Sequence, residues 1–335
     1  MKDAIGQLIM AGLPGPDLDN GTVELIHRFR ICNFIFFRRN LNKGPEQANG
    51  LTEGIKLVCQ DAGVPSPLIA VDQEGGPVQR LAPPFWPSLI SNQEVGRSKW
   101  PEEVVIEQAK NAAEWLGKIG VNINLAPVLD LAFSHQNEVL AKRCYGPDAS
   151  ITASLGALYI DILQERFIAA TAKHFPGIGR IKQDPHLKRP TISAAAETIL
   201  TEALPFRTAV EANVMAVMTS HISYPAFDKE NIATFSRTIA NDLLRGEFGF
   251  DGVLITDDLE MGGIVEHDLV PEAAIKALNA GHDMLLICHD QELVRKSANA
   301  IEEAVRKDIL SKELLLQSVE RIGKMRSFVK GGGIS

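Results

Sequence analysis

The chain has 335 residues, of which 45% are hydrophobic and 23% are charged, a composition typical of folded globular proteins and not of disordered ones. Its 34 basic and 42 acidic residues give a net charge of −8. A negative surface repels phosphate backbones, so a dedicated nucleic-acid-binding function is not expected. The apolar run near the start is too short for a secretory signal, and no stretch approaches the length of a membrane span.

The four cysteines lie far apart and form no Cys-x-x-Cys pair. This spacing favours neither a disulfide framework nor a cysteine zinc site. We therefore expect reduced thiols and a cytoplasmic protein. The cysteines are Cys32, Cys59, Cys144 and Cys288.

Eight short apolar or β-branched runs alternate with segments that have helical periodicity, which predicts strands separated by helices. The predicted strands span residues 7–11, 33–37, 68–71, 122–126, 169–173, 216–219, 252–256 and 283–288. The residues expected to open helices are Pro101, Ser236, Pro271 and Ser311, and those expected to end them are Gly120 and Gly281.

This alternation, with no Pro/Gly/Ser-rich linker, predicts a single-domain (β/α)8 barrel, also called a TIM barrel, over residues 1–335. A doubly wound open sheet is the structural alternative. A nucleotide-binding sheet of that kind carries Gly-x-Gly-x-x-Gly after an early strand, and the candidate Gly177-Ile-Gly179 lacks the third glycine. The barrel is therefore favoured.

Barrel enzymes build their active sites where the strands end, so polar residues that directly follow an apolar run are candidates. Asp72 and Glu74 follow the third strand. Asp72 is expected to accept hydrogen bonds from substrate hydroxyls and Arg80 to donate them, unless this loop only caps backbone groups. Arg143 presents a planar fork suited to oxygen ligands, although a lone arginine in a loop is often a surface residue.

Lys173 and His174 together end the fifth strand, and a glycine-containing loop follows them. On this loop Asp184 and His186 lie two residues apart, with Pro185 between them. A carboxylate at that spacing can orient an imidazole and raise its basicity, as a proton shuttle requires. The alternatives are a satisfied core histidine for His174 and a solvated loop for the Asp-x-His pair.

The seventh strand delivers two adjacent carboxylates, Asp257 and Asp258, to the barrel mouth. Consecutive residues of a strand point to opposite sides, so one is expected to face the site while the other anchors the loop. A carboxylate in a site can act as a nucleophile toward a sugar carbon. His221 ends the sixth strand, and its role stays open between structure and function.

An Asp nucleophile, a His with an Asp partner, and hydroxyl-binding side chains at successive strand ends are together typical of a glycosidase. At these residues the chain resembles glycoside hydrolase family 3, in particular its single-domain NagZ-type β-N-acetylglucosaminidases (β-N-acetylhexosaminidases). The matching motifs are Val71-Asp-Gln-Glu-Gly-Gly, Arg143-Cys-Tyr-Gly, Lys173-His-Phe-Pro-Gly-x-Gly, Asp184-x-His186 and Thr256-Asp-Asp-Leu-x-Met261.

The resemblance implies a retaining double displacement. Asp257 would be the nucleophile, and Asp184 with His186 the acid/base dyad. Larger members of the family carry a second domain that supplies the acid/base, so a single barrel is consistent with a dyad on a loop. The residues implied to bind the sugar are Asp72, Arg80, Arg143, Lys173 and His174.

The resemblance further implies the biological setting. The expected reaction removes N-acetylglucosamine from 1,6-anhydro-muropeptides, or from related oligosaccharides, during cytoplasmic cell-wall recycling. A monomer is expected, with no cofactor and no metal. Three positions depart from the family pattern: Ile178 and Pro77 lie beside the expected catalytic groups, and Pro185 falls inside the dyad, where it could alter how far the loop swings.

Three other functions remain open. A phosphorylase could use the same two steps, because a neutral imidazole repels an incoming phosphate less than a carboxylate does. A metal-dependent hydrolase could use His174, Asp184, His186 and Asp257 as ligands. A non-catalytic protein could keep the sugar pocket without turnover, an alternative motivated by Pro185.

Overall fold

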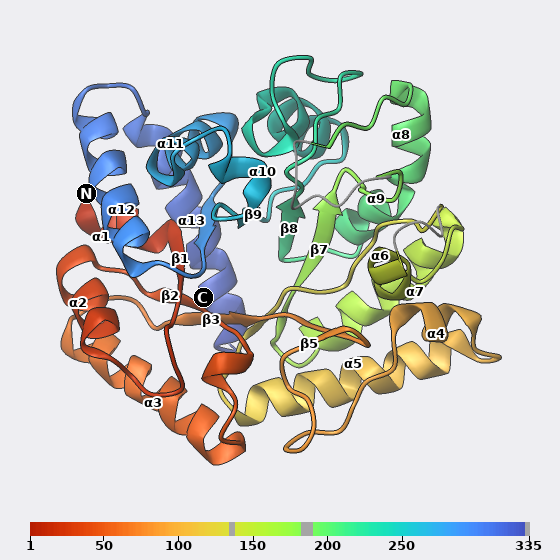
Figure 1. Cartoon of the computed structure of the whole chain (residues 1–335), viewed down its shortest axis with the longest axis horizontal. Coiled ribbons are helices and arrows are strands. Elements are labelled where there is room, and N and C mark those ends of the chain that lie inside the picture. The colour runs from red at the N-terminus through yellow and green to blue at the C-terminus, as the bar shows by residue number, and fades with distance from the viewer. Residues whose placement is uncertain (134–137, 182–189, 332–335) are drawn as a thin grey trace.

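Eight parallel strands close into a barrel at the centre of the molecule (Figure 1). The computed structural model describes residues 1–133, 138–181 and 190–331. Around the barrel the strand order is β1-β10-β9-β8-β7-β6-β3-β2, so β1 pairs with both β10 and β2. The predicted (β/α)8 barrel is confirmed. Its strands are β1 (Ile9–Gly12), β2 (Asn33–Phe36), β3 (Leu68–Val71), β6 (Ile123–Asn124), β7 (Ala169–Phe175), β8 (Ala216–Thr219), β9 (Val253–Asp258) and β10 (Met284–Ile287).

All eight strands coincide with predicted apolar runs, but several of their ends differ. β1 begins later than predicted because Gln7 closes the short helix α1 (Lys2–Gln7). In contrast, β7 and β9 continue past their predicted ends, to Phe175 and Asp258. Because of these extensions, His174, Asp257 and Asp258 belong to strands and not to loops. Strands hold side chains more rigidly than loops do.

Two of the predicted helix starts, at Pro101 and Ser311, are confirmed. Pro101 opens α5 (Pro101–Lys118), where its missing N–H costs no hydrogen bond, and the chain turns at Gly120 with φ of +71°. Ser311 precedes α13 (Lys312–Val329) and its side chain accepts a hydrogen bond from the first turn.

The two other predicted helices differ in detail. α11 (Val270–Ala280) begins one residue before Pro271 and ends at Gly281, whose φ of +112° favours glycine. Ser236 does accept a hydrogen bond from the following helix, but that helix, η3 (Thr238–Glu247), is a π-helix. Its apolar spacing resembles that of an α-helix, so the sequence did not distinguish the two.

The remaining helices surround the barrel (Figure 1) or lie in the loops between strands and helices. Among the described residues, none of the helices has the combination of length and apolar character that crossing a bilayer requires. These helices are α2 (Asn20–Phe29), α3 (Pro45–Asp61), α4 (Asn92–Arg97), α6 (Glu138–Arg143), α7 (Ala149–Gln164), α8 (Ala196–Glu202), α9 (Leu204–Glu211), α10 (Gly262–Val265), α12 (Gln291–Arg306), η1 (Arg38–Asn40) and η2 (Ala233–Phe235).

A small antiparallel hairpin directly follows β3 and was not predicted. It consists of β4 (Gln73–Gly75) and β5 (Val78–Gln79). Gly75 and Gly76 have φ of +100° and +56°, values that side chains with a Cβ rarely adopt. The hairpin turns the chain back toward the barrel, so that Arg80 reaches the same cavity as Asp72, the residue that follows β3.

Candidate active site

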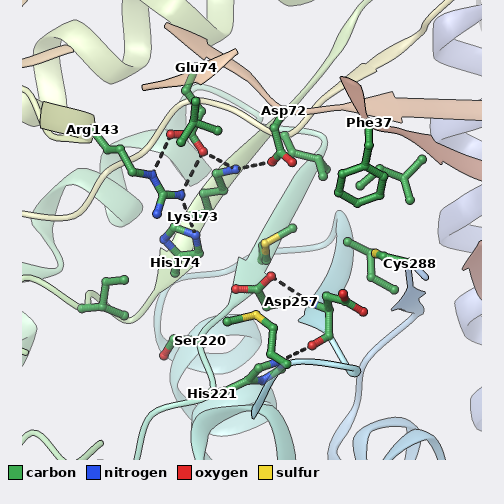
Figure 2. A pocket seen from close by; sticks show the side chains of 18 of the residues that line it. Phe37, Asp72, Glu74, Arg143, Lys173, His174, Ser220, His221, Asp257 and Cys288 are labelled. Atoms are coloured by element: carbon green, nitrogen blue, oxygen red, sulfur yellow. Dashed lines mark hydrogen bonds and ion pairs between the residues drawn. The ribbon is translucent and has the colours of Figure 1, made fainter. Parts of the chain in front are cut away.

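A cavity of about 400 Å³ opens where the barrel strands end, the end at which barrel enzymes carry their active sites. Six of the eight predicted site residues line it, and all of these except Arg80 are labelled in Figure 2. The other two, Asp184 and His186, lie outside the described residues. The six lining residues are Asp72, Arg80, Arg143, Lys173, His174 and Asp257.

Alternate strands supply the apolar and the charged parts of this cavity. Apolar side chains come from β2, β8, β10 and the residue just after β6. The strands between them, β3, β7 and β9, end in the charged ones. This alternation follows from the layered interior of eight-stranded barrels, in which alternate strands fill the same layer. The apolar residues from these strand positions are Ile35, Leu125, Met218 and Leu286.

Lys173 bridges two carboxylates in the wall of the cavity (Figure 2). Its Nζ lies 2.8 Å from Asp72 Oδ1 and 2.7 Å from Glu74 Oε1. Arg143 donates two hydrogen bonds to Glu74, at 2.8 Å and 2.9 Å, and Arg80 donates one to Asp72 at 2.9 Å. The side chains of Lys173 and Glu74 are 2% and 0% exposed. Mutual neutralisation is therefore what makes their burial possible.

These contacts fix the ionisation of the cluster. Burial would raise the pKa of Asp72, but the charges of Lys173 and Arg80 outweigh it and hold this pKa well below its usual range. The pKa of Glu74 is lowered in the same way, against burial, by Arg143 and Lys173. Burial would lower the pKa of Lys173, yet the two carboxylates raise it. The cluster therefore stays fully charged at neutral pH.

The interpretations of this loop as a backbone cap, and of Arg143 as a surface residue, are not supported. Asp72 pairs with two cations, and the Arg143 side chain is 20% exposed and bonds a buried carboxylate. Glu74 was seen in the sequence at a strand end but was not selected as a site residue. The structure makes Glu74 the support that holds Lys173 and Arg143 in the cavity wall.

His174 is oriented by a buried carboxylate that the sequence analysis did not single out. Asp130 Oδ2 lies 2.7 Å from His174 Nδ1, and its Oδ1 accepts hydrogen bonds from the backbone N–H groups of His174 and Ile178. Arg143 lies 3.3 Å from Nε2 and can only donate. Nε2 must then accept, which leaves the ring proton on Nδ1. Lys173 and His174 are joined by a cis peptide bond, and both reach the cavity.

Asp257, near the end of β9, presents its carboxylate to the cavity below Lys173 and His174 (Figure 2). Its Oδ1 accepts a hydrogen bond of 2.8 Å from the backbone N–H of Asp258. Within the described residues Asp257 has no cationic partner, in contrast to Asp72 and the buried carboxylate beside it. An unneutralised carboxylate that faces a cavity is free to react with a ligand.

Asp258 also lines the cavity, whereas we expected one of the two adjacent carboxylates to face away. The chain turns directly after it, so strict strand alternation does not apply. Asp258 does anchor this turn, because its Oδ1 accepts a hydrogen bond of 3.1 Å from the Glu260 N–H. Its Oδ2 lies 3.3 Å from His289 Nε2. Burial raises the pKa of Asp258 to about 7.

His221 lines the cavity from the end of β8 and is 5% exposed. Its Nε2 lies 3.0 Å from the backbone oxygen of Asp258, and its Nδ1 lies 2.6 Å from Thr234 Oγ1. Burial lowers the pKa of the His221 ring, against a smaller opposing effect of the Asp257 carboxylate. The structure thus places His221 in the cavity wall, next to the segment that carries Asp257.

The Asp-x-His pair and Pro185 lie outside the described residues, so the acid/base dyad remains a prediction. The other two positions that depart from the family pattern, Pro77 and Ile178, lie within the described residues. Ile178 lines the cavity, and Pro77 is exposed at the turn between β4 and β5. Within residues 1–133, 138–181 and 190–331, no group of three or more His, Cys, Asp or Glu side chains is arranged to hold a metal ion.

A family model described as the glycosyl hydrolase family 3 N terminal domain matches residues 1–325. The chain belongs to glycoside hydrolase family 3. Among curated relatives, the β-hexosaminidase of Tolumonas auensis is 33% identical over 298 residues, which is 84% of this chain and 83% of that protein. The β-hexosaminidase of Haemophilus influenzae is 32% identical over 288 residues, 85% of this chain and 80% of that protein.

Solved structures of family 3 enzymes have the same fold as this chain. The family 3 β-N-acetylglucosaminidase from Paenibacillus sp. str. FPU-7 has a TM-score of 0.94 and 34% identity, and covers 100% of this chain. This chain spans 64% of that protein. The β-N-acetylhexosaminidase of Beutenbergia cavernae has a TM-score of 0.90 and 26% identity, over 97% of this chain and 98% of its own. The predicted resemblance is confirmed, and the chain is a glycoside hydrolase.

Two residues of this family 3 site were missed although the sequence contained a signal for each. Asp130 directly follows the apolar run Val128-Leu129, as Asp257 directly follows its predicted strand. The rule that selects polar residues directly after apolar runs would therefore have selected Asp130. Cys288 directly follows the apolar run that forms β10, and although it is only 1% exposed it lines the cavity.

Proposed function

We propose that this family 3 enzyme is a retaining exo-β-N-acetylglucosaminidase. In this proposal Asp257 attacks the anomeric carbon of a terminal β-linked N-acetylglucosamine, the glycosidic bond breaks, and a covalent glycosyl-enzyme forms. The observation that carries the proposal is the Asp257 carboxylate, which faces the cavity without a cationic partner among the described residues. The names of its β-hexosaminidase relatives support the choice of sugar.

The charged cluster would bind the hydroxyl groups of the sugar. Asp72 offers carboxylate oxygens to hydroxyl donors, while Lys173 and Arg143 offer N–H groups to hydroxyl oxygens, and Arg80 and His174 complete the set. Each of these groups is already held by a partner in the protein. Binding would therefore require little reorganisation, which is the property that makes a polar site effective.

The proton transfers are assigned to Asp184 and His186. His186 would protonate the departing glycosidic oxygen and then, as a base, remove a proton from the water that hydrolyses the Asp257 ester. Asp184 would orient the imidazole. The usual separation of two carboxylates in retaining glycosidases is not required here, because the second partner is an imidazole.

We also propose that residues 1–335 act as one catalytic unit, as a cytoplasmic monomer without cofactor or metal. The proposed substrates are 1,6-anhydro-muropeptides or related oligosaccharides with a terminal N-acetylglucosamine. These statements rest on the family resemblance, and the cavity volume of about 400 Å³ and its charged wall suit a single sugar.

The direct test is turnover of aryl β-N-acetylglucosaminide by the purified chain, with the first-formed anomer read by NMR. We expect hydrolysis, an initial β-anomer, and full activity in a chelator. An initial α-anomer would exclude a retaining mechanism. Formation of sugar 1-phosphate in the presence of phosphate would indicate a phosphorylase, loss of activity in chelator a metal enzyme, and binding without turnover a non-catalytic sugar-binding protein.

A further inference from the structure

Both backbone groups of Asp258 form hydrogen bonds at the mouth of the barrel. Its N–H donates to Asp257 Oδ1 at 2.8 Å, and its carbonyl oxygen lies 3.0 Å from His221 Nε2. A carbonyl oxygen only accepts, so Nε2 must carry a proton. The residue whose N–H orients the Asp257 carboxylate is therefore itself held by the imidazole at the end of β8.

The Thr234 hydroxyl contacts the other nitrogen of the His221 ring, Nδ1. The Thr234 hydroxyl has one proton and two neighbouring acceptors, His221 Nδ1 at 2.6 Å and the Ser220 carbonyl at 3.0 Å. Burial favours the neutral ring, and a neutral ring with a proton on Nε2 has an unprotonated Nδ1. In this tautomer the one Thr234 proton goes to Nδ1 and not to the Ser220 oxygen, so the shorter of the two contacts is the hydrogen bond.

We propose that His221 is a positioning residue for the nucleophile. Through the Asp258 carbonyl it holds the backbone that orients the Asp257 carboxylate, and the Thr234 hydroxyl holds the opposite side of the ring at Nδ1. The inference rests on the proposed role of Asp257 and adds to it a group that touches neither the reacting carbon nor the leaving oxygen.

The surroundings of the ring agree with this role. The charged and titratable groups around it are the Asp257 and Asp258 carboxylates on β9 and the rings of His174 and His282. The ring is 5% exposed, and its removal would leave a backbone carbonyl of the cavity wall without its donor. Small changes in the direction of a nucleophile reduce rates strongly, since about 1 Å of misplacement can cost about 100-fold.

The test compares matched variants of the full chain. His221→Leu removes both ring nitrogens, whereas His221→Gln keeps an amide N–H that can reach the Asp258 carbonyl. Thr234→Val removes the hydroxyl at Nδ1, and Thr234→Ser restores it. His282→Gln is the control, because His282 is another buried ring, 1% exposed and bonded to Thr219 at 2.8 Å, that does not line the cavity.

The measured quantity is the rate of covalent inactivation by a 5-fluoro derivative of an N-acetylglucosaminyl fluoride, separated into a maximal rate and an apparent affinity. For His221→Leu we expect the maximal rate to fall by about 10- to 100-fold with the affinity nearly unchanged. His221→Gln should stay within about threefold of the parent chain, and Thr234→Val should fall between them. His282→Gln should lower Tm but label at the parent rate.

An NMR measurement reads the tautomer directly. Long-range ¹H–¹⁵N correlations should show the His221 proton on Nε2 in the parent chain, in Thr234→Ser and in Thr234→Val, because the Asp258 carbonyl remains its acceptor in all three. A proton on Nδ1 in the parent chain would overturn the proposal even if His221→Leu did not fold.

The kinetic outcomes separate this inference from the proposed function. If the parent chain is labelled on a residue other than Asp257, both fall. If Asp257 is labelled normally and His221→Leu reacts as fast as the parent chain, only the inference falls. It also falls if the loss is entirely in apparent affinity, or if His221→Gln is as slow as His221→Leu.

Discussion

The ammonium of Lys173 lies 2.8 Å from the Asp72 carboxylate, and the lysine side chain is only 2% exposed. The same ammonium contacts Glu74 at 2.7 Å. The cation keeps both carboxylates charged, and Arg80 and Arg143 each add a second partner to one of them. The wall of the active site and the stability of the barrel mouth therefore depend on the same contacts.

Replacement of Lys173 by Met should impair both stability and binding. The loss leaves Asp72 and Glu74 with only their arginine partners, and breaking a buried ion pair costs at most about 3–5 kcal/mol. Urea unfolding measures this cost, and KM for the aryl sugar measures binding. As a control, Lys43→Met breaks an exposed pair with Asp17 and should change the free energy of unfolding by less than about 1 kcal/mol. Equal effects of the two substitutions would contradict this account.

Asp130→Asn should misorient His174. An amide cannot accept hydrogen bonds with both of its polar atoms, whereas Asp130 accepts from the His174 ring and from two backbone N–H groups. We expect kcat/KM to fall by about 10- to 100-fold and the free energy of unfolding to fall by about 1–3 kcal/mol. Steady-state kinetics and chemical denaturation test the two parts separately. Parent-like kinetics in the variant would show that this hydrogen-bond set does not orient His174.

Asp258 should make stability fall as pH rises. Its pKa is about 7 in the folded chain because of burial, above the value near 4 expected when unfolded. The folded state then binds more protons than the unfolded state between these two values, so stability declines from about pH 4 to about pH 7 and levels off above. Asp258→Asn should remove this slope. Thermal unfolding across pH 4 to 8 tests it, and an unchanged slope in the variant would exclude Asp258 as the cause.

His186→Ala should affect substrates according to their leaving groups. An activated aryl group departs without protonation, but a sugar or alkyl group needs the acid. We expect the loss in kcat/KM to grow as the pKa of the leaving group rises. A series of aryl N-acetylglucosaminides measures this dependence. Equal losses across the series would contradict the assignment of His186 as the acid.

The sequence predicted the barrel well because each strand is a short apolar run between turn residues, a local signal. The rule that polar residues at strand ends form the site also uses a local signal, and six of the eight residues expected in the site line the cavity. The hairpin β4–β5 escaped prediction because its residues, from Gln73 to Gln79, are largely polar and glycine-rich. The π-helix η3 escaped because apolar spacing does not report hydrogen-bond register.

Local sequence patterns also did not show which site residues contact each other. Asp130 and His174 are 44 residues apart, and Glu74 and Arg143 are 69 apart. Only closure of the barrel brings such residues into contact. The sequence could indicate which residue types stand at strand ends, but not which of them neutralise each other. Nor could it indicate which carboxylate has no cationic partner among the residues that the structure describes.

The central claim is that Asp257 bonds covalently to the sugar. The most direct measurement is mass spectrometric peptide mapping after brief reaction with a 5-fluoro N-acetylglucosaminyl fluoride. The account predicts one sugar adduct, on the peptide that contains Asp257, and no adduct in Asp257→Ala, whose turnover should fall by on the order of 10⁴-fold. An adduct on another residue, or an active Asp257→Ala enzyme, would contradict it.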